Sequence, residues 1–249
     1  MVDRRRFITT ASLAAAAAMA NARSANGNST ARRSGMPDRS RVWRIGTPPS
    51  IANLQLVMRD TPTPAADEVL VRVAASSINA RDRGIVAGFF PIGANKASIP
   101  LSEGAGEVIA VGANVSRIKV GDRVASCHFP RWVTGRWSPD VYENDIGNTL
   151  DGWLGEKVIL PESGIVVLPK EISYESAATL ASSGVTAWHA LFEIARLRPG
   201  QTVLTLGTGG VSTIGLQLAK AAGARVVVTS DRKSTRLNSS HTDISRMPS

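Results

Sequence analysis

The sequence predicts an α/β protein whose C-terminal third contains the opening of a dinucleotide-binding fold, and three features support this prediction. Residues 202–206 are apolar or β-branched, and they follow the turn signal Pro199-Gly200. A glycine-rich turn occupies residues 207–210. Residues 211–222 carry apolar side chains at helical spacing, and a second apolar run follows at 224–229. This order predicts a strand, a turn, a helix and a parallel strand.

The glycine turn has the composition of a phosphate-binding loop. Gly207 allows a tight turn, while Gly209 and Gly210 have no Cβ to keep a pyrophosphate from the N–H groups of the next helix. We expect that helix at 211–222, with Gly223 as its stop. Because Ser212 replaces the third glycine of the G-x-G-x-x-G pattern, this stretch alone leaves an ordinary βα turn open. The helix face expected to pack on the sheet comprises Val211, Ile214, Leu218 and Ala221.

Seven motifs, the glycine turn among them, lie along residues 43–230. They are SINARD (77–82), GFFP (88–91), EGAGEVIAVG (103–112), VGDRV (120–124), LPESG (160–164), SGVTAWHAL (183–191) and GTGGVS (207–212). In order and approximate spacing they resemble the medium-chain dehydrogenase/reductase superfamily, in its zinc-free quinone-oxidoreductase-like and zinc-type alcohol dehydrogenase-like branch. The resemblance implies a GroES-like β-rich barrel domain at 41–170, followed by the start of a Rossmann doubly wound parallel sheet at 171–230. Short β-rich runs between Gly/Pro turns in 41–169 suit the barrel.

The resemblance also bears on metals. In zinc-dependent relatives two cysteines and a histidine hold the catalytic metal, at positions that here are Asn79, Ser102 and Ser183. Amide and hydroxyl groups are poor ligands for tetrahedral zinc, and a structural site of four cysteines is excluded by the single Cys127. We therefore expect no metal. We expect Cys127 to be a buried strand residue, and His128 and His189 to be packing or surface residues.

Without zinc, alcohol oxidation loses the Lewis acid that stabilises an alkoxide. Reduction of a conjugated double bond needs only hydrogen-bond donors for an enolate oxygen. The resemblance thus implies hydride transfer from NADP(H), with NAD(H) as the other option, to a quinone or another α,β-unsaturated carbonyl compound. An alcohol dehydrogenase and a non-catalytic NADPH-binding homologue stay open as alternatives.

The family pattern assigns roles to particular residues. Asn79 and Asp82 are the candidate catalytic residues, as polar groups at the cleft, although Asn and Asp also favour strand ends for their turn chemistry. Phe90 stands where the family often has a tyrosine, so the proton donor is not identified. The expected coenzyme contacts are Thr186 at the nicotinamide, Gly207, Thr208, Gly209, Gly210 and Val211 at the pyrophosphate, and Ser230 at a 2′-phosphate.

Residues 1–22 have the composition of an export signal. A basic start precedes an apolar stretch over about residues 7–20 and small residues suited to cleavage. DRRRFIT resembles the twin-arginine motif, with Arg4 and Arg5 as the pair. The apolar stretch is shorter than the roughly 20 residues of a spanning helix. We expect a twin-arginine signal peptide at 1–22, a disordered linker at 23–40 and a periplasmic protein, or a cytoplasmic one if the signal is not used.

Residues 231–249 show no periodicity, and a nucleotide sequence that encodes their first part, DRKSTRLNSSH, resembles a sequencing-library adapter. We expect them to be a non-native tail, so Asp231 is not assigned as the acidic ribose-binding residue of NAD enzymes. The chain is then a C-terminally truncated fragment with only the first βαβ unit of its Rossmann sheet, and we expect it to be inactive by itself.

The net charge of +9 does not mark a nucleic-acid-binding protein. Residues 41–230 are nearly neutral, with 18 Lys and Arg against 16 Asp and Glu, so most of the excess lies in the two ends. The expected partners are a small carbonyl or quinone substrate and the twin-arginine export machinery. A homodimer of the full-length protein is left open.

Overall fold

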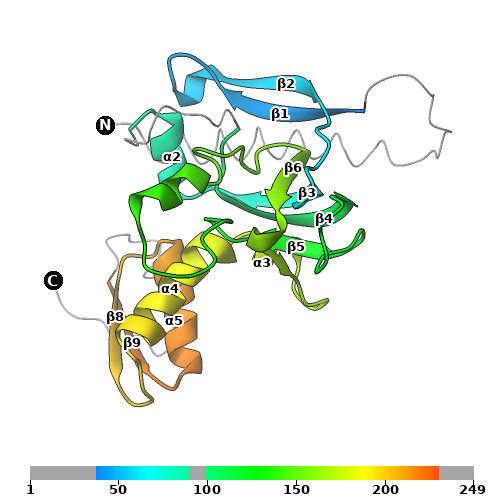
Figure 1. The fold of residues 1–249 in the computed structure, drawn as a ribbon. Coiled ribbons are helices and arrows are strands. Elements are labelled where there is room, and N and C mark those ends of the chain that lie inside the picture. Colours follow the sequence, from blue (N-terminus) through cyan, green and yellow to red (C-terminus); the bar gives the residue numbers. More distant parts are fainter. Residues whose placement is uncertain (1–37, 90–98, 230–249) are drawn as a thin grey trace. The chain divides into compact units, whose positions relative to one another are not determined.

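The computed structural model describes residues 38–89 and 99–229 (Figure 1). The proposed signal peptide with Arg4 and Arg5, Phe90, Ser230 and the 231–249 tail lie outside the described residues. Among the helices of the described part, none is both long and apolar enough to span a membrane.

The expected β-rich domain is confirmed as two antiparallel sheets. β1 (Arg39–Ile45) pairs with β2 (Leu54–Asp60). The larger sheet has the order β6-β3-β4-β5-β7, and every pair of neighbours is antiparallel. Its strands are β3 (Glu68–Ser77), β4 (Glu103–Val111), β5 (Arg123–Ser126), β6 (Lys157–Pro161) and β7 (Ile165–Val167). Short helices connect them: η1 (Ile51–Asn53), α2 (Ala80–Val86), η2 (Pro139–Asn144) and η3 (Glu162–Gly164).

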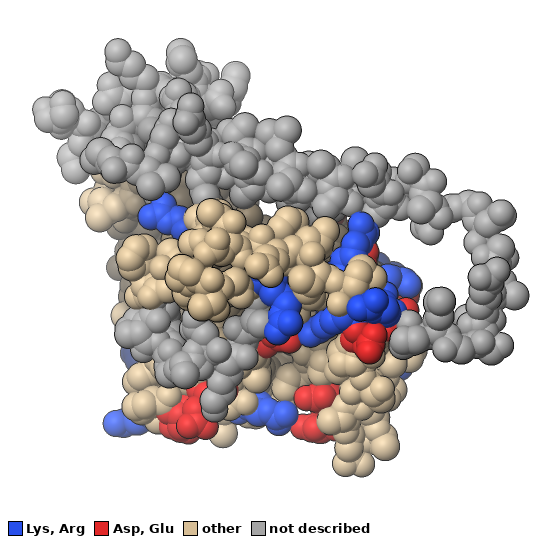
Figure 2. Space-filling model, turned by 90° about the horizontal axis from the view of Figure 1, so that it is seen from above, with Lys and Arg blue, Asp and Glu red and all other residues tan. Residues whose placement is uncertain are grey.

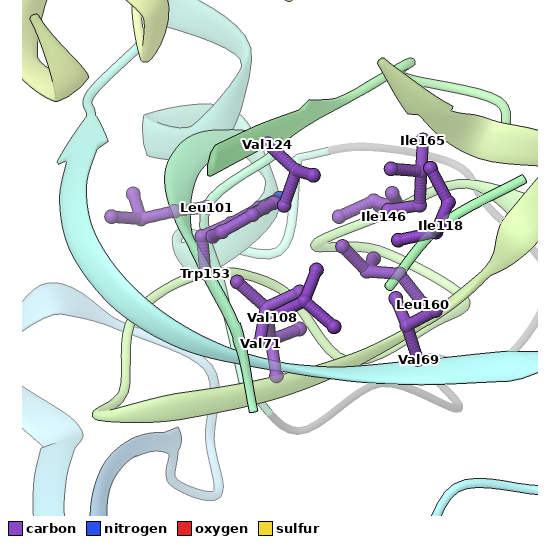
Figure 3. Packing of buried hydrophobic residues seen from close by; sticks show 11 residues of the cluster. Val69, Val71, Leu101, Val108, Ile118, Val124, Ile146, Trp153, Leu160 and Ile165 are labelled. Carbon is purple, nitrogen blue, oxygen red and sulfur yellow. The ribbon is translucent and has the colours of Figure 1, made fainter. Parts of the chain in front are cut away.

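The larger of the two apolar clusters packs on the larger sheet (Figure 3). Alternate residues of β3 and their neighbours on β4 point into it, because successive side chains of a strand face opposite sides. Trp153 is completely buried there, and its indole N–H donates to Ser126 Oγ at 3.0 Å. A methyl group on Gly104 would lie 2.5 Å from the indole ring, so glycine is required at that position. The labelled residues of this core include Val69, Val71, Val108, Val124 and Leu160.

The predicted strand–turn–helix–strand unit is also confirmed. β8 (Thr202–Leu206) pairs in parallel with β9 (Arg225–Thr229), and α5 (Gly210–Ala221) connects them. Gly223 ends the helix in the left-handed region, with φ +77°. The elements that precede this unit are α3 (Tyr174–Ala177), the π-helical turn η4 (Leu180–Gly184), α4 (Val185–Trp188) and the π-helical turn η5 (His189–Ile194).

The prediction that Val211 and Ala221 belong to the packing face of α5 was wrong. Val211 is 43% exposed and Ala221 is exposed, whereas Gly215 and Ala219 are buried. α5 packs against α4 as well as against β8 and β9, and Ala187 of α4 lies beside Gly215. Because α4 also packs on α5, the buried face of the helix includes the small residues Gly215 and Ala219.

The prediction that Cys127 is a buried strand residue was also wrong. Cys127 follows the last residue of β5 and is exposed, because the strand ends at Ser126. On the face seen in Figure 2, basic and acidic side chains lie beside one another. Ion pairs such as Arg39 with Asp60 and Arg41 with Glu156 join β1 to its neighbours. This face therefore carries mixed charge rather than an unbroken basic surface.

Candidate functional site

The coenzyme turn between β8 and α5 is open to a ligand. Gly207 has φ +78°, and no atom lies within 4 Å of a methyl group placed on Gly207 or Gly209. α5 begins at Gly210, so the N–H groups of its first turn have no partner within the helix. The helix N-terminus and the missing Cβ atoms together fit the pyrophosphate of a dinucleotide.

The other predicted coenzyme residues of the described part lie beside this turn or on α4, which packs against α5. Thr208 and Val211 are exposed beside the glycines. Thr186 is exposed on α4, and its hydroxyl donates to the Ser182 carbonyl at 2.7 Å. Thr229 Oγ1 accepts the Gly207 N–H at 3.2 Å, so the end of β9 helps to shape the turn.

Asn79 and Asp82 meet where β3 leads into α2. The Asn79 backbone N–H donates to Asp82 Oδ2 at 2.8 Å, as in one half of a capping box. The other carboxylate oxygen, Asp82 Oδ1, accepts the Ser102 N–H at 3.0 Å and the Ser102 hydroxyl at 2.5 Å. Asp82 is only 2% exposed. It therefore anchors the start of α2, while the partly exposed Asn79 presents the side chain nearer to solvent.

A second carboxylate, Glu103, holds the Asn79 side chain. Glu103 lies at the start of β4 and is 1% exposed. Its Oε1 accepts Asn79 Nδ2 and Ser77 Oγ, each at 2.6 Å. Its Oε2 accepts the backbone N–H of Ser182 at 2.6 Å. One buried carboxylate thus joins the end of β3, the start of α2 and the turn η4.

Arg81 forms the centre of a neighbouring cluster. Its Nη1 donates to Ser102 Oγ at 2.6 Å and also contacts His128 Nε2, while its Nη2 donates to Asp145 Oδ2 at 2.6 Å. His128 Nε2 lies 3.0 Å from Asp145 Oδ1. The His128 ring stacks on Phe129, with centroids 4.6 Å apart. His128 therefore packs on Phe129, as expected, and also contacts Arg81 and Asp145 through its ring nitrogen.

Burial and hydrogen bonding shift the pKa of the two aspartates in opposite directions. Burial raises the pKa of Asp82, and hydrogen bonds from Ser102 and the Asn79 backbone only partly oppose this. Burial would also raise the pKa of Asp145, but hydrogen bonds from His128 and Arg81 and the Arg81 charge outweigh it and lower that pKa. Asp145 is therefore held as a carboxylate beside the guanidinium.

Ser183 connects this region with the coenzyme turn. Its hydroxyl donates to Asn79 Oδ1 at 3.4 Å. A methyl group on Gly210 would lie 2.9 Å from the same hydroxyl oxygen. The structure thus brings together Asn79, Ser183 and the first residue of α5, three of the positions selected from the sequence.

Sequence reasoning missed four residues of the site: Arg81, Glu103, His128 as a polar partner, and Asp145. Arg81 and Glu103 lie inside the motifs SINARD and EGAGEVIAVG, so closer attention to their charged side chains could have selected them. Asp145 is 64 residues from Arg81 and lies in no such motif. No local pattern indicates its pairing.

The three positions compared with zinc ligands fit a metal poorly. Asn79 is hydrogen-bonded through both ends of its amide, and the Ser102 hydroxyl lies between Arg81 and Asp82. A guanidinium at 2.6 Å from Ser102 Oγ would repel a second cation. Within residues 38–89 and 99–229, no three His, Cys, Asp or Glu side chains gather in a group that could hold a metal ion.

Comparison with known proteins gives a consistent set of relatives. The model of the alcohol dehydrogenase GroES-like domain matches residues 65–170. A zinc-type alcohol dehydrogenase-like protein of Schizosaccharomyces pombe is 40% identical over 182 residues, which cover 70% of this chain and 53% of that protein. The chain thus spans about half the length of this curated relative.

Two solved structures share the fold. A protein named as an alcohol dehydrogenase from Sinorhizobium meliloti 1021 is 35% identical with a TM-score of 0.76, and the match covers 84% of this chain and 63% of that one. A quinone oxidoreductase of Pseudomonas syringae pv. tomato DC3000 is 28% identical with a TM-score of 0.64, and the match covers 82% and 60%.

Proposed function

Because the chain belongs to the medium-chain dehydrogenase/reductase superfamily, we propose that the full-length protein is a nicotinamide-dependent oxidoreductase. We propose further that it reduces a quinone or another α,β-unsaturated carbonyl compound without zinc. The observation that carries this proposal is the hydrogen bonding of Asn79 and Ser102. At two of the three positions compared with zinc ligands, the side chain is already bonded to other residues of the protein.

The residues that would hold the coenzyme are those of the open turn. Gly207, Gly209 and Gly210 would admit the pyrophosphate, and Thr186 on α4 would lie toward the nicotinamide. When bound, the reduced coenzyme supplies a hydride. We propose NADPH over NADH, because Thr229 and Ser230 offer hydroxyl groups rather than a carboxylate near the end of β9.

Asn79 is the proposed donor to the substrate. Hydride addition at the β-carbon of an enone moves an electron pair onto the carbonyl oxygen, and a fixed N–H stabilises that charge. A proton from solvent water must then reach the α-carbon of the enolate to complete the reduction. Asn79 Nδ2 gives one hydrogen to Glu103, and the described residues offer no partner to its second hydrogen.

The coenzyme part of the proposal is tested on the protein made from its complete natural reading frame. Gly209→Val places a branched side chain where the pyrophosphate would approach, and we expect NADPH to bind on the order of 100-fold more weakly. Ala221→Val is the matched control, because it adds the same side chain to the exposed far end of α5. Titration of NADPH fluorescence measures both, and equal affinities for the two variants would exclude the turn as the coenzyme site.

The substrate part is tested by turnover. With NADPH we expect reduction of quinones or enones, unchanged by a chelator and without stoichiometric zinc by elemental analysis. The names of the relatives favour one competing function, a zinc-assisted alcohol dehydrogenase. Activity on simple alcohols that a chelator abolishes would establish that alternative. NADPH binding without turnover of any of these substrates would instead indicate a non-catalytic homologue.

We also propose export through the twin-arginine machinery, which rests on the sequence of residues 1–22 alone. Changing Arg4 and Arg5 to Lys keeps the charge but removes the guanidinium pair, so precursor should accumulate in the cytoplasm. Fractionation of cells that express the two proteins measures this, and unchanged export would rule the signal out.

A further inference from the structure

Glu103 is a buried carboxylate for which the proposed reaction has no direct use. It is 1% exposed, and its three hydrogen-bond donors are a side-chain amide, a hydroxyl and a backbone N–H. All three donate, so the carboxylate acts here only as an acceptor. Burying a charged group is costly unless such bonds compensate. Because burying a carboxylate costs free energy, we expect Glu103 to have a role beyond packing.

The contacts of Glu103 fix which way the Asn79 amide points. A carboxylate only accepts, so the atom that faces Glu103 Oε1 at 2.6 Å must be Asn79 Nδ2. The Ser183 hydroxyl then meets Asn79 Oδ1. Both ends of the amide are thereby assigned by chemistry, and rotation by 180° would place its carbonyl oxygen against the carboxylate.

We propose that Glu103 is a positioning residue, which orients the Asn79 amide so that its second N–H meets the substrate carbonyl oxygen. This inference rests on the proposed function, because it assumes that a carbonyl oxygen is the group to be bound. An amide already bonded to a carboxylate loses less freedom when the substrate arrives, and the negative charge polarises its N–H groups.

Glu103→Gln is the decisive variant, because it keeps the size of the side chain. A Gln amide can no longer accept from all three donors, since one of its two polar atoms is itself a donor. In the full-length protein with an enone, we expect kcat to fall about 10- to 100-fold with little change in KM. Ser77→Ala is the matched control, because it removes another 2.6 Å bond to the same oxygen without touching Asn79; we expect less than about a twofold change.

A double-mutant cycle distinguishes positioning from a general structural role. If Glu103 acts through Asn79, the Glu103→Gln change should have no further effect on kcat in an Asn79→Ala background. Independent, multiplicative losses would overturn the inference, because Glu103 would then act through Ser182 or through the fold.

A spectroscopic measurement needs no turnover. In the full-length protein labelled with [¹⁵N]asparagine, the Asn79 side-chain proton that bonds to Glu103 should give an NMR signal downfield of the usual asparagine amide range, because the carboxylate deshields it. This downfield shift should be lost in Glu103→Gln and persist in Ser77→Ala. Persistence of the shift in Glu103→Gln would overturn the inference. A wild-type full-length protein without enone turnover would count against the proposed function alone, because the NMR result would still report the orientation of the amide.

Discussion

The two regions of the molecule differ in how completely they bury their apolar side chains. Between β3 and β7 the sheet encloses a core in which Trp153 is fully buried. In the β8–β9 region Leu206 is 74% exposed, and Leu204 and Ile194 are also exposed. Parallel strands are usually covered on both faces, whereas here two helical segments, α4 and α5, accompany a two-stranded parallel sheet. Among the described residues, the first region encloses a core of its own, whereas these apolar side chains of the second region are exposed.

The sharpest test of this comparison is to shorten one large side chain to alanine in each region. Trp153→Ala removes a buried indole and its bond to Ser126, so we expect a loss of about 3–5 kcal/mol in the free energy of unfolding. Leu206→Ala removes a side chain that is largely in water, and we expect a change within about 0.5 kcal/mol. Urea unfolding measures both. Similar losses would show that Leu206 is covered in solution and that the contrast between the regions does not hold.

The buried ion pair of the first region gives the next largest effect. Asp145→Asn removes the carboxylate that pairs with Arg81, and we expect a loss of about 3 kcal/mol at pH 7. The folded state lowers the pKa of Asp145, so its contribution is complete above the unfolded value of about 4 and disappears as the pH falls through the folded pKa. Stability measured from pH 7 to pH 2 should therefore fall less in Asp145→Asn than in the wild type. Parallel curves would mean that Asp145 does not titrate with folding.

Hydrogen exchange compares the two sheets without substitution. Amides that pair β8 with β9 should exchange at least about tenfold faster than those that pair β3 with β4, because fewer buried contacts oppose local opening. Mass spectrometry of peptides from the two pairs measures this. Equal protection would indicate that the small parallel sheet opens only with the whole molecule.

A smaller loss than in the two buried sites is expected where the two regions meet. Gly210→Ala brings a methyl group to 2.9 Å from Ser183 Oγ, and we expect a loss of about 1 kcal/mol. Ser183→Ala removes that oxygen and should restore most of the stability in the double variant. If the double variant is no more stable than Gly210→Ala, the contact between Ser183 and α5 is not the cause.

The sequence predicted the βαβ unit to within a residue or so at each boundary, because its signals are local: a Pro-Gly turn, a glycine loop and apolar periodicity. The buried face of α5 could not be predicted as well, because it depends on α4, which packs against α5 beside Gly215. Asn79 and Asp82 could be named through a family resemblance. The pairing of Arg81 with Asp145 could not be predicted, because it depends on a tertiary contact between residues 64 positions apart, which produces no local sequence pattern.

The three hydrogen bonds of Glu103 also order the events of folding. The bonds to Ser77 and Asn79 close segments of 26 and 24 residues within the first region, while the bond to Ser182 spans 79 residues. Longer loops cost more entropy to close, so we expect the first two bonds to form before the third. The amide of Asn79 would then acquire its orientation in the first region, and the chain that carries the coenzyme turn would dock onto a carboxylate already in place.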